Sequence, residues 1–80
     1  MKKKRLKLIW DFKGPDAENT ARHHAHHLNQ FAFNENLELV NTDIEKIGEE
    51  HFISYMIVMQ KEVLKIRDIL KPQRAQYTTE

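Results

Sequence analysis

The run from His51 to Met59 is the most apolar stretch of this 80-residue chain. Short apolar runs that are bounded by turn residues are typical of strands buried on both faces. The preceding residues, Gly48, Glu49 and Glu50, have the composition of a hairpin turn. A chain of this length forms one small domain with a limited core. We therefore expect a sheet that is built around a central strand at His51–Met59.

Two further strands are predicted before this central one. The first alternates apolar with mostly polar residues, the period-two pattern of a strand with one buried face. Its alternating apolar positions are Leu6, Leu8, Trp10 and Phe12. The second runs from about Leu37 to Ile47. Its alternation slips at Leu39 and Val40, and a β-bulge would explain that slip.

Two helices are predicted, each by apolar residues at helical spacing. The first begins near Pro15, which follows Gly14 and precedes acidic residues, and extends to about Asn34. Its apolar stripe contains Ala17, Ala21, His24, Ala25, Leu28, Phe31 and Ala32. The second covers Lys61 to Leu70 and ends before Pro72. Its side chains predicted to face the core are Val63, Ile66, Leu70 and Ile69.

The element order βαββα predicts an α+β, two-layer sandwich. A right-handed crossover from the first strand to the second leaves room for the third between them, which gives a three-stranded sheet in the order 1-3-2 with both helices on one face. From Lys4 to Leu70 this arrangement resembles the ferredoxin-like split βαβ fold without its final strand. Such a resemblance concerns topology alone, because the fold carries many functions. We expect residues 1–72 to form a single α+β domain and residues 73–80 to form a flexible C-terminal tail, because that tail has no periodic pattern.

The absent fourth strand and the bare second face of the sheet predict an association surface. The edge of the first strand would be unpaired, and apolar residues would meet water on the face that no helix covers. The predicted interface residues are Ile9, Phe52, Met56 and Val58. A homodimer, in which this patch meets its own copy through the face or the edge, would bury them. The alternative is a register displaced by one residue, with the C-terminal tail covering the rest.

Composition restricts the classes of partner. The chain has no cysteine, which fits a reducing compartment, and we expect a cytoplasmic protein. Its 13 basic and 12 acidic residues give a net charge of +1, too balanced to indicate a polyanion partner. The basic N-terminus, Lys2, Lys3, Lys4, Arg5 and Lys7, precedes an apolar stretch too short for a signal peptide or a membrane span. Basic residues also protect a strand edge, and no RNA-recognition motif accompanies them, so neither nucleic acid nor a membrane is an expected partner.

Four histidines crowd the segment His23–His27. On a helix, His23 and His27 lie one turn apart on the same flank, the spacing that lets two imidazoles hold one zinc or nickel ion. Two ligands do not complete a site, and the sequence indicates no third, so the expectation is that no cofactor is bound and metal binding is the alternative. His24 lies in the apolar stripe and is predicted to be a neutral histidine at the edge of the core. His26 is predicted to be solvated.

Asp11 and His51 form a second candidate site, because the topology brings the end of the first strand beside the start of the third. An aspartate that orients an imidazole suits general acid–base chemistry, and the nearby helix start could bind an anion. The sequence offers no nucleophile or glycine-rich phosphate loop to accompany them. A simpler role is hydrogen bonding to the turn. The chain is therefore predicted to be a non-enzymatic association domain, with no small-molecule ligand indicated.

Overall fold

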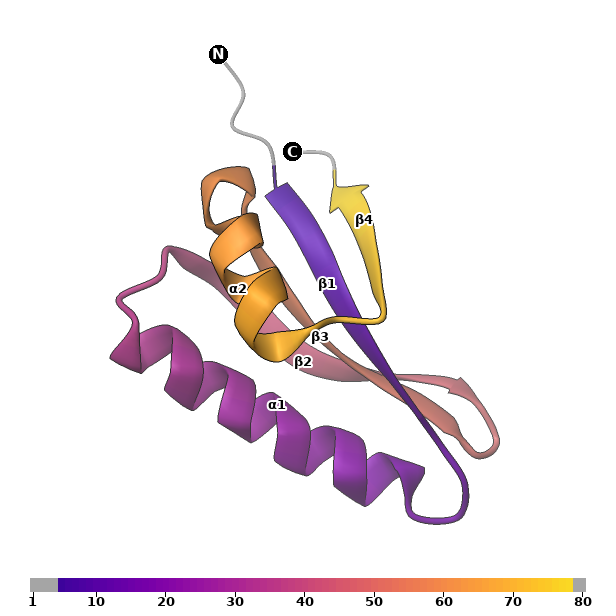
Figure 1. Ribbon diagram of the computed structural model, residues 1–80. Coiled ribbons are helices and arrows are strands. Elements are labelled where there is room, and N and C mark those ends of the chain that lie inside the picture. Colours follow the sequence, from indigo (N-terminus) through magenta and orange to yellow (C-terminus); the bar gives the residue numbers. More distant parts are fainter. Residues whose placement is uncertain (1–4, 79–80) are drawn as a thin grey trace.

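The computed structural model describes residues 5–78 and shows a sheet with both helices on one of its faces (Figure 1). Within these residues, seven elements follow one another: β1 (Arg5–Lys13), α1 (Ala17–Asn34), β2 (Leu39–Gly48), β3 (His51–Met59), the 3₁₀ helix η1 (Gln60–Glu62), α2 (Val63–Leu70) and β4 (Arg74–Thr78). Among the described residues, no helix is long and apolar enough to cross a membrane.

The sheet has four strands in the order β2-β3-β1-β4, and each neighbouring pair is antiparallel. The predicted three-stranded sheet is therefore wrong, although the α+β class agrees with the structure. The additional strand comes from the segment predicted to be a loose tail. Its residues Arg74 to Thr78 pair with Ile9 to Arg5 of β1. Because β4 occupies this edge, the predicted pairing of first strands between two copies is also wrong.

Several local predictions are confirmed. The central strand β3 covers His51–Met59 and lies between β2 and β1. Glu49 and Glu50 form the turn between β2 and β3. The register of β2 against β3 shifts between Leu39 and Asn41, at the position where a bulge was predicted. These features follow from short stretches of sequence, where turn residues and an interrupted alternation act locally.

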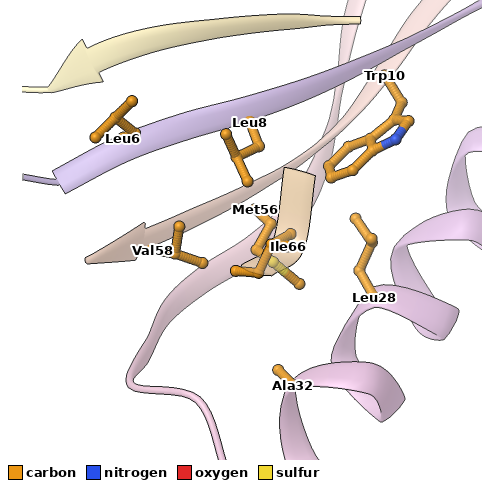
Figure 2. Packing of buried hydrophobic residues seen from close by; sticks show 8 residues of the cluster. All are labelled: Leu6, Leu8, Trp10, Leu28, Ala32, Met56, Val58 and Ile66. Carbon is orange, nitrogen blue, oxygen red and sulfur yellow. The ribbon is translucent and has the colours of Figure 1, made fainter. Parts of the chain in front are cut away.

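The core lies between the sheet and the helices (Figure 2). Leu8 pairs with Met56 and Leu6 pairs with Val58, so these side chains share one face. The buried cluster consists of Leu6, Leu8, Trp10, Leu28, Ala32, Met56, Val58 and Ile66, with Phe12 and others packed against it. The predicted orientation of Phe52, Met56 and Val58 toward the helix-free face is therefore wrong, because a shift of one residue turns every side chain of a strand over.

The two helices are attached to this face in different ways. α1 buries small side chains at Ala17, Ala21 and Ala32, which allow its backbone to lie close to the sheet. α2 buries Ile66, and its C-terminal end is held by Trp10, whose indole Nε1–H donates to the carbonyl of Leu70 at 3.0 Å. The last carbonyl groups of a helix lack partners within the helix, so this bond satisfies one of them.

Candidate functional site

A polar cluster forms on the helix-free face around the carboxylate of Asp11. His51 Nε2 lies 2.8 Å from Asp11 Oδ1. Arg74 grips the same carboxylate from the other side, with Nε donating to Oδ2 at 3.0 Å and Nη2 donating to Oδ1 at 2.9 Å. The cluster thus joins β1, β3 and β4. The structure brings together the two residues that the sequence indicated, and it adds an arginine.

Gln73, the residue just before β4, extends the hydrogen bonding between β4 and β1. Its backbone N–H donates to the carbonyl of Ile9 at 2.9 Å, and its side-chain Oε1 accepts from the N–H of Asp11 at 3.0 Å. Sequence reasoning missed both Gln73 and Arg74, because the residues after Pro72 were predicted to be a loose tail. A signal was present: Ala75 and Tyr77 alternate with polar residues, as in a short strand.

The contacts of Asp11 determine the protonation of the cluster. Burial would raise the pKa of Asp11, but hydrogen bonds from Arg74 and His51, together with their charges, lower that pKa below its ordinary value of 3.8. The carboxylate is therefore ionised at neutral pH and only accepts hydrogen bonds, so Nε2 of His51 carries the proton. In the neutral imidazole, the other ring nitrogen, Nδ1, is then a hydrogen-bond acceptor.

A shallow hollow of about 650 Å³ opens over this cluster. It is lined by Asp11, Lys13, Ile47, His51, Gln73 and Arg74. Lys13 stands directly opposite His51 in the strand register, so its ammonium group adds a second cation to the rim. The hollow combines an oriented imidazole, two cationic side chains and one apolar side chain, which are groups suited to holding a small anion.

His24 lies at the core edge, as its place in the apolar stripe predicts. Its Nδ1 and the Oγ of Ser54 share a hydrogen bond of 2.6 Å, and its ring packs against the rings of Trp10 and Phe12. Burial of the ring, and to a lesser extent the charge of His27, lowers the pKa of His24. Ser54 is 0% exposed, so this serine and histidine pair cannot reach an outside substrate and is a structural contact.

The histidine flank of α1 brings two imidazoles together. Nε2 of His23 and Nε2 of His27 are 3.0 Å apart and exposed to solvent. Within residues 5–78, no group of three or more histidine, cysteine, aspartate or glutamate side chains is arranged to hold a metal ion. The spacing of the two ligands is present, and a third ligand is not found in the described part of the chain.

The helix-free face carries a different set of residues from the one predicted. Of the predicted interface residues, Ile9 alone lies on it, and Ile9 is 2% exposed. Its register row runs across all four strands as Asp43, Tyr55, Ile9 and Arg74. Burial and the negative charges of Asp43 and Glu45 raise the pKa of Tyr55, although a hydrogen bond to Asn41 opposes this effect, so the hydroxyl stays neutral.

Lys7 crosses the same face. Its ammonium group lies 4.4 Å from the centre of the Tyr55 ring and 3.4 Å from Glu45 Oε1. Long polar side chains therefore surround the apolar residues of the face, and this explains why Ile9 and Ile53, each 2% exposed, are shielded without a helix above them.

The N-terminal lysines Lys2, Lys3 and Lys4, on which the expectation about nucleic acid depends, lie outside the described residues. Comparison with known proteins gives no match to a family model, to a curated protein or to a solved structure.

Proposed function

We propose that this chain is a non-enzymatic association domain whose helix-free sheet face docks against a second copy of itself. The proposal rests on one row of paired residues that crosses the helix-free face from β2 to β4: Asp43, Tyr55, Ile9 and Arg74. An acid stands at one end of this row, a base stands at the other, and two largely apolar side chains lie between them. A face with this pattern is complementary to its own copy in one orientation.

That orientation has the two-fold axis parallel to the strands. Rotation about such an axis reverses the order of the strands, so β2 of one copy lies over β4 of its partner. Asp43 then faces Arg74 in both directions, and Tyr55 lies over Ile9. Arg74 uses Nε and Nη2 to hold Asp11, which leaves the outer nitrogen Nη1 for this contact.

An axis across the strands is unfavourable, because it lays β2 over β2. On this face β2 carries Asn41, Asp43 and Glu45, so acidic side chains would meet each other. The partly exposed Tyr55 and Ile57 supply the apolar contact in the favourable orientation. Charge pattern therefore selects one dimer, while the limited apolar exposure predicts that it is weak.

The test is a charge reversal at Asp43. Because a two-fold axis repeats each contact, Asp43→Lys replaces two attractions by two repulsions, and we expect the dimer dissociation constant to rise about tenfold. Sedimentation equilibrium of the variant and the wild type measures this change. Asp68→Lys, an equal charge change on exposed α2, is the matched control. A wild-type chain that stays monomeric at high micromolar concentration, or equal weakening by both substitutions, contradicts the proposal.

A cytoplasmic location belongs to the same proposal. It is supported by the absence of cysteine from the sequence, since the domain does not depend on an oxidising compartment for its stability.

Metal binding by His23 and His27 is the second candidate function. One observation favours it: their Nε2 atoms are 3.0 Å apart, whereas two nitrogen ligands of a tetrahedral zinc ion are about 3.4 Å apart. A small rotation of either ring would fit zinc or nickel. Calorimetric titration with zinc should show stoichiometric binding that His27→Ala abolishes and His26→Ala leaves intact. Equal loss in both variants, or no saturable binding, would exclude it.

A further inference from the structure

We propose that the hollow over Asp11, His51 and Arg74 binds a phosphate group. The site is complete in one chain, because the hollow lies at the end of the sheet beside the β2–β3 turn and is lined by residues of one chain. Nη1 of Arg74 is also the donor proposed for Asp43 of a second copy, so phosphate binding and self-association compete for this nitrogen. Its volume, about 650 Å³, lies in the range of small-molecule sites.

Charge supports an anion as the ligand. Of the residues that line the hollow, Asp11 is the one with an acidic side chain. Arg74 hydrogen-bonds to both of its carboxylate oxygen atoms, and His51 contacts one of them. Lys13 and Arg74 supply two positive charges against this one negative charge. The bidentate grip of Arg74 on Asp11 holds the guanidinium in a fixed position and leaves Nη1 as a donor. An incoming anion thus meets a guanidinium donor that is already oriented, with the carboxylate of Asp11 neutralised behind it.

The imidazole favours phosphate over other anions. When the ring of His51 is neutral and Nε2 donates to the ionised Asp11, its Nδ1 accepts a hydrogen bond. Hydrogen phosphate keeps one hydroxyl group above neutral pH and can donate to Nδ1 while its other oxygen atoms accept from Lys13 and Arg74. Sulfate and acetate have no proton to donate under these conditions. The same arrangement of donors and one acceptor therefore discriminates among oxyanions of similar size.

The apolar rim distinguishes two sources of phosphate. Ile47 is 48% exposed and borders the hollow, so a phosphate monoester with an apolar substituent would gain a contact that the free ion lacks. Above neutral pH the monoester is a dianion without a hydroxyl group, so it also loses the hydrogen bond to Nδ1 of His51 that hydrogen phosphate can donate. Phenyl phosphate and inorganic phosphate are therefore the two probes. Tighter binding of the ester identifies a phosphorylated organic ligand, and tighter binding of the ion identifies free phosphate. Either result supports the site.

The experiment is an NMR titration that follows the His51 ring and the backbone amides of the full chain at constant ionic strength, slightly above neutral pH. We expect saturable shifts with phosphate, and binding of sulfate that is roughly fivefold weaker, the effect of one hydrogen bond. Lys13→Gln should weaken phosphate binding about tenfold. Lys46→Gln is the matched control: it makes the same change near the same end of the sheet, but Lys46 pairs with Phe52 on the helix-covered face.

Amide spectra show directly whether each variant remains folded. Since Lys13 has an exposed side chain at the end of β1, Lys13→Gln should keep the fold even if a substitution at Arg74 loosens β4. The absence of saturable shifts with both phosphate probes would overturn the proposal, and so would equal weakening by Lys13→Gln and Lys46→Gln. Sulfate that binds as tightly as phosphate would overturn the role assigned to His51. Asp43 does not line the hollow. The result of the phosphate titration can therefore be interpreted even if the dimer test fails.

Discussion

Truncation of Met56 tests the register of β3, on which the division of the molecule into a covered and an open face depends. Met56 is 0% exposed and belongs to the buried cluster with Leu8, Leu28 and Ile66 (Figure 2). Met56→Ala removes most of a packed side chain and leaves a cavity, so we expect a loss of about 2–5 kcal/mol from the free energy of unfolding. A domain of 80 residues has about 4–12 kcal/mol in total, so the variant should be close to unfolding.

Ile57 provides the matched comparison, because it is the next residue of the same strand and lies on the opposite face. It is partly exposed, and Ile57→Ala should therefore cost about 1 kcal/mol, which combines a limited loss of burial with the lower strand preference of alanine. Urea unfolding followed by the fluorescence of Trp10 gives both values, provided that the slope with urea stays constant.

The decisive quantity is the order of the two losses. If Ile57→Ala costs as much as Met56→Ala or more, the register described above is refuted and the opposite orientation of β3 is restored. Should Met56→Ala fail to fold, Met56→Leu keeps the volume and is expected to cost less than about 1.5 kcal/mol. The same pair can then be compared as Met56→Leu and Ile57→Leu.

Three further predictions concern other contacts. Burial and the charge of His27 lower the pKa of His24 in the folded protein below 6.5, its ordinary value, which the unfolded chain keeps. Its neutral form therefore contributes fully to stability above pH 6.5, and this contribution is lost as the pH falls from 6.5 through the pKa of the folded state. Urea titrations at stepped pH should therefore show a fall in stability below pH 6.5 that His24→Gln reduces; an unchanged fall contradicts it. Trp10→Phe removes the donor to the Leu70 carbonyl and should lower the free energy of unfolding by about 2 kcal/mol, as measured by urea unfolding that is followed by circular dichroism; unaltered stability would mean that water replaces the bond. In the proposed dimer Asn41 lies over Gln76 of the other copy, about 10 Å away across the packed faces, a gap wider than a disulfide spans. A bismaleimide cross-linker of matching length should therefore join a mixture of Asn41→Cys and Gln76→Cys chains, as assayed on a denaturing gel, more than either alone; preferential Asn41→Cys homodimers would indicate an axis across the strands.

Local patterns in the sequence were sufficient for the elements up to α2. The apolar run at β3, the turn at Glu49 and Glu50 and the slip before Asn41 each depend on a few adjacent residues. The contact between Asp11 and His51 could also be anticipated, because it follows from the topology of β1 and β3. The elements could be predicted because one stretch of chain contains the whole signal of each, whereas the contact between Asp11 and His51 also required the right-handed crossover.

The orientation of β3 could not be predicted in the same way. Both of its faces are apolar, so period-two alternation does not show which set of alternate side chains points toward the helices. The polarity of Ser54 does not show it either: a polar residue is typical of the solvated face, yet its hydroxyl is buried against His24. The sequence did contain two halves of this contact, a histidine within an apolar helix stripe and a serine within an apolar strand. A buried polar group requires a partner, so matching these two would have given the register.

The fourth strand was missed because it is only five residues long and follows a proline. Its consequences extend beyond the sheet. β4 pairs with the edge of β1, and it places Arg74 where the guanidinium neutralises Asp11 and forms the basic end of the row that begins at Asp43. Arg74 therefore contributes to both proposals, but through different neighbours: Lys13 acts only in the hollow, and Asp43 acts only across the face. Substitutions at these two positions separate ligand binding from association, whereas a substitution at Arg74 would affect both and could not distinguish them.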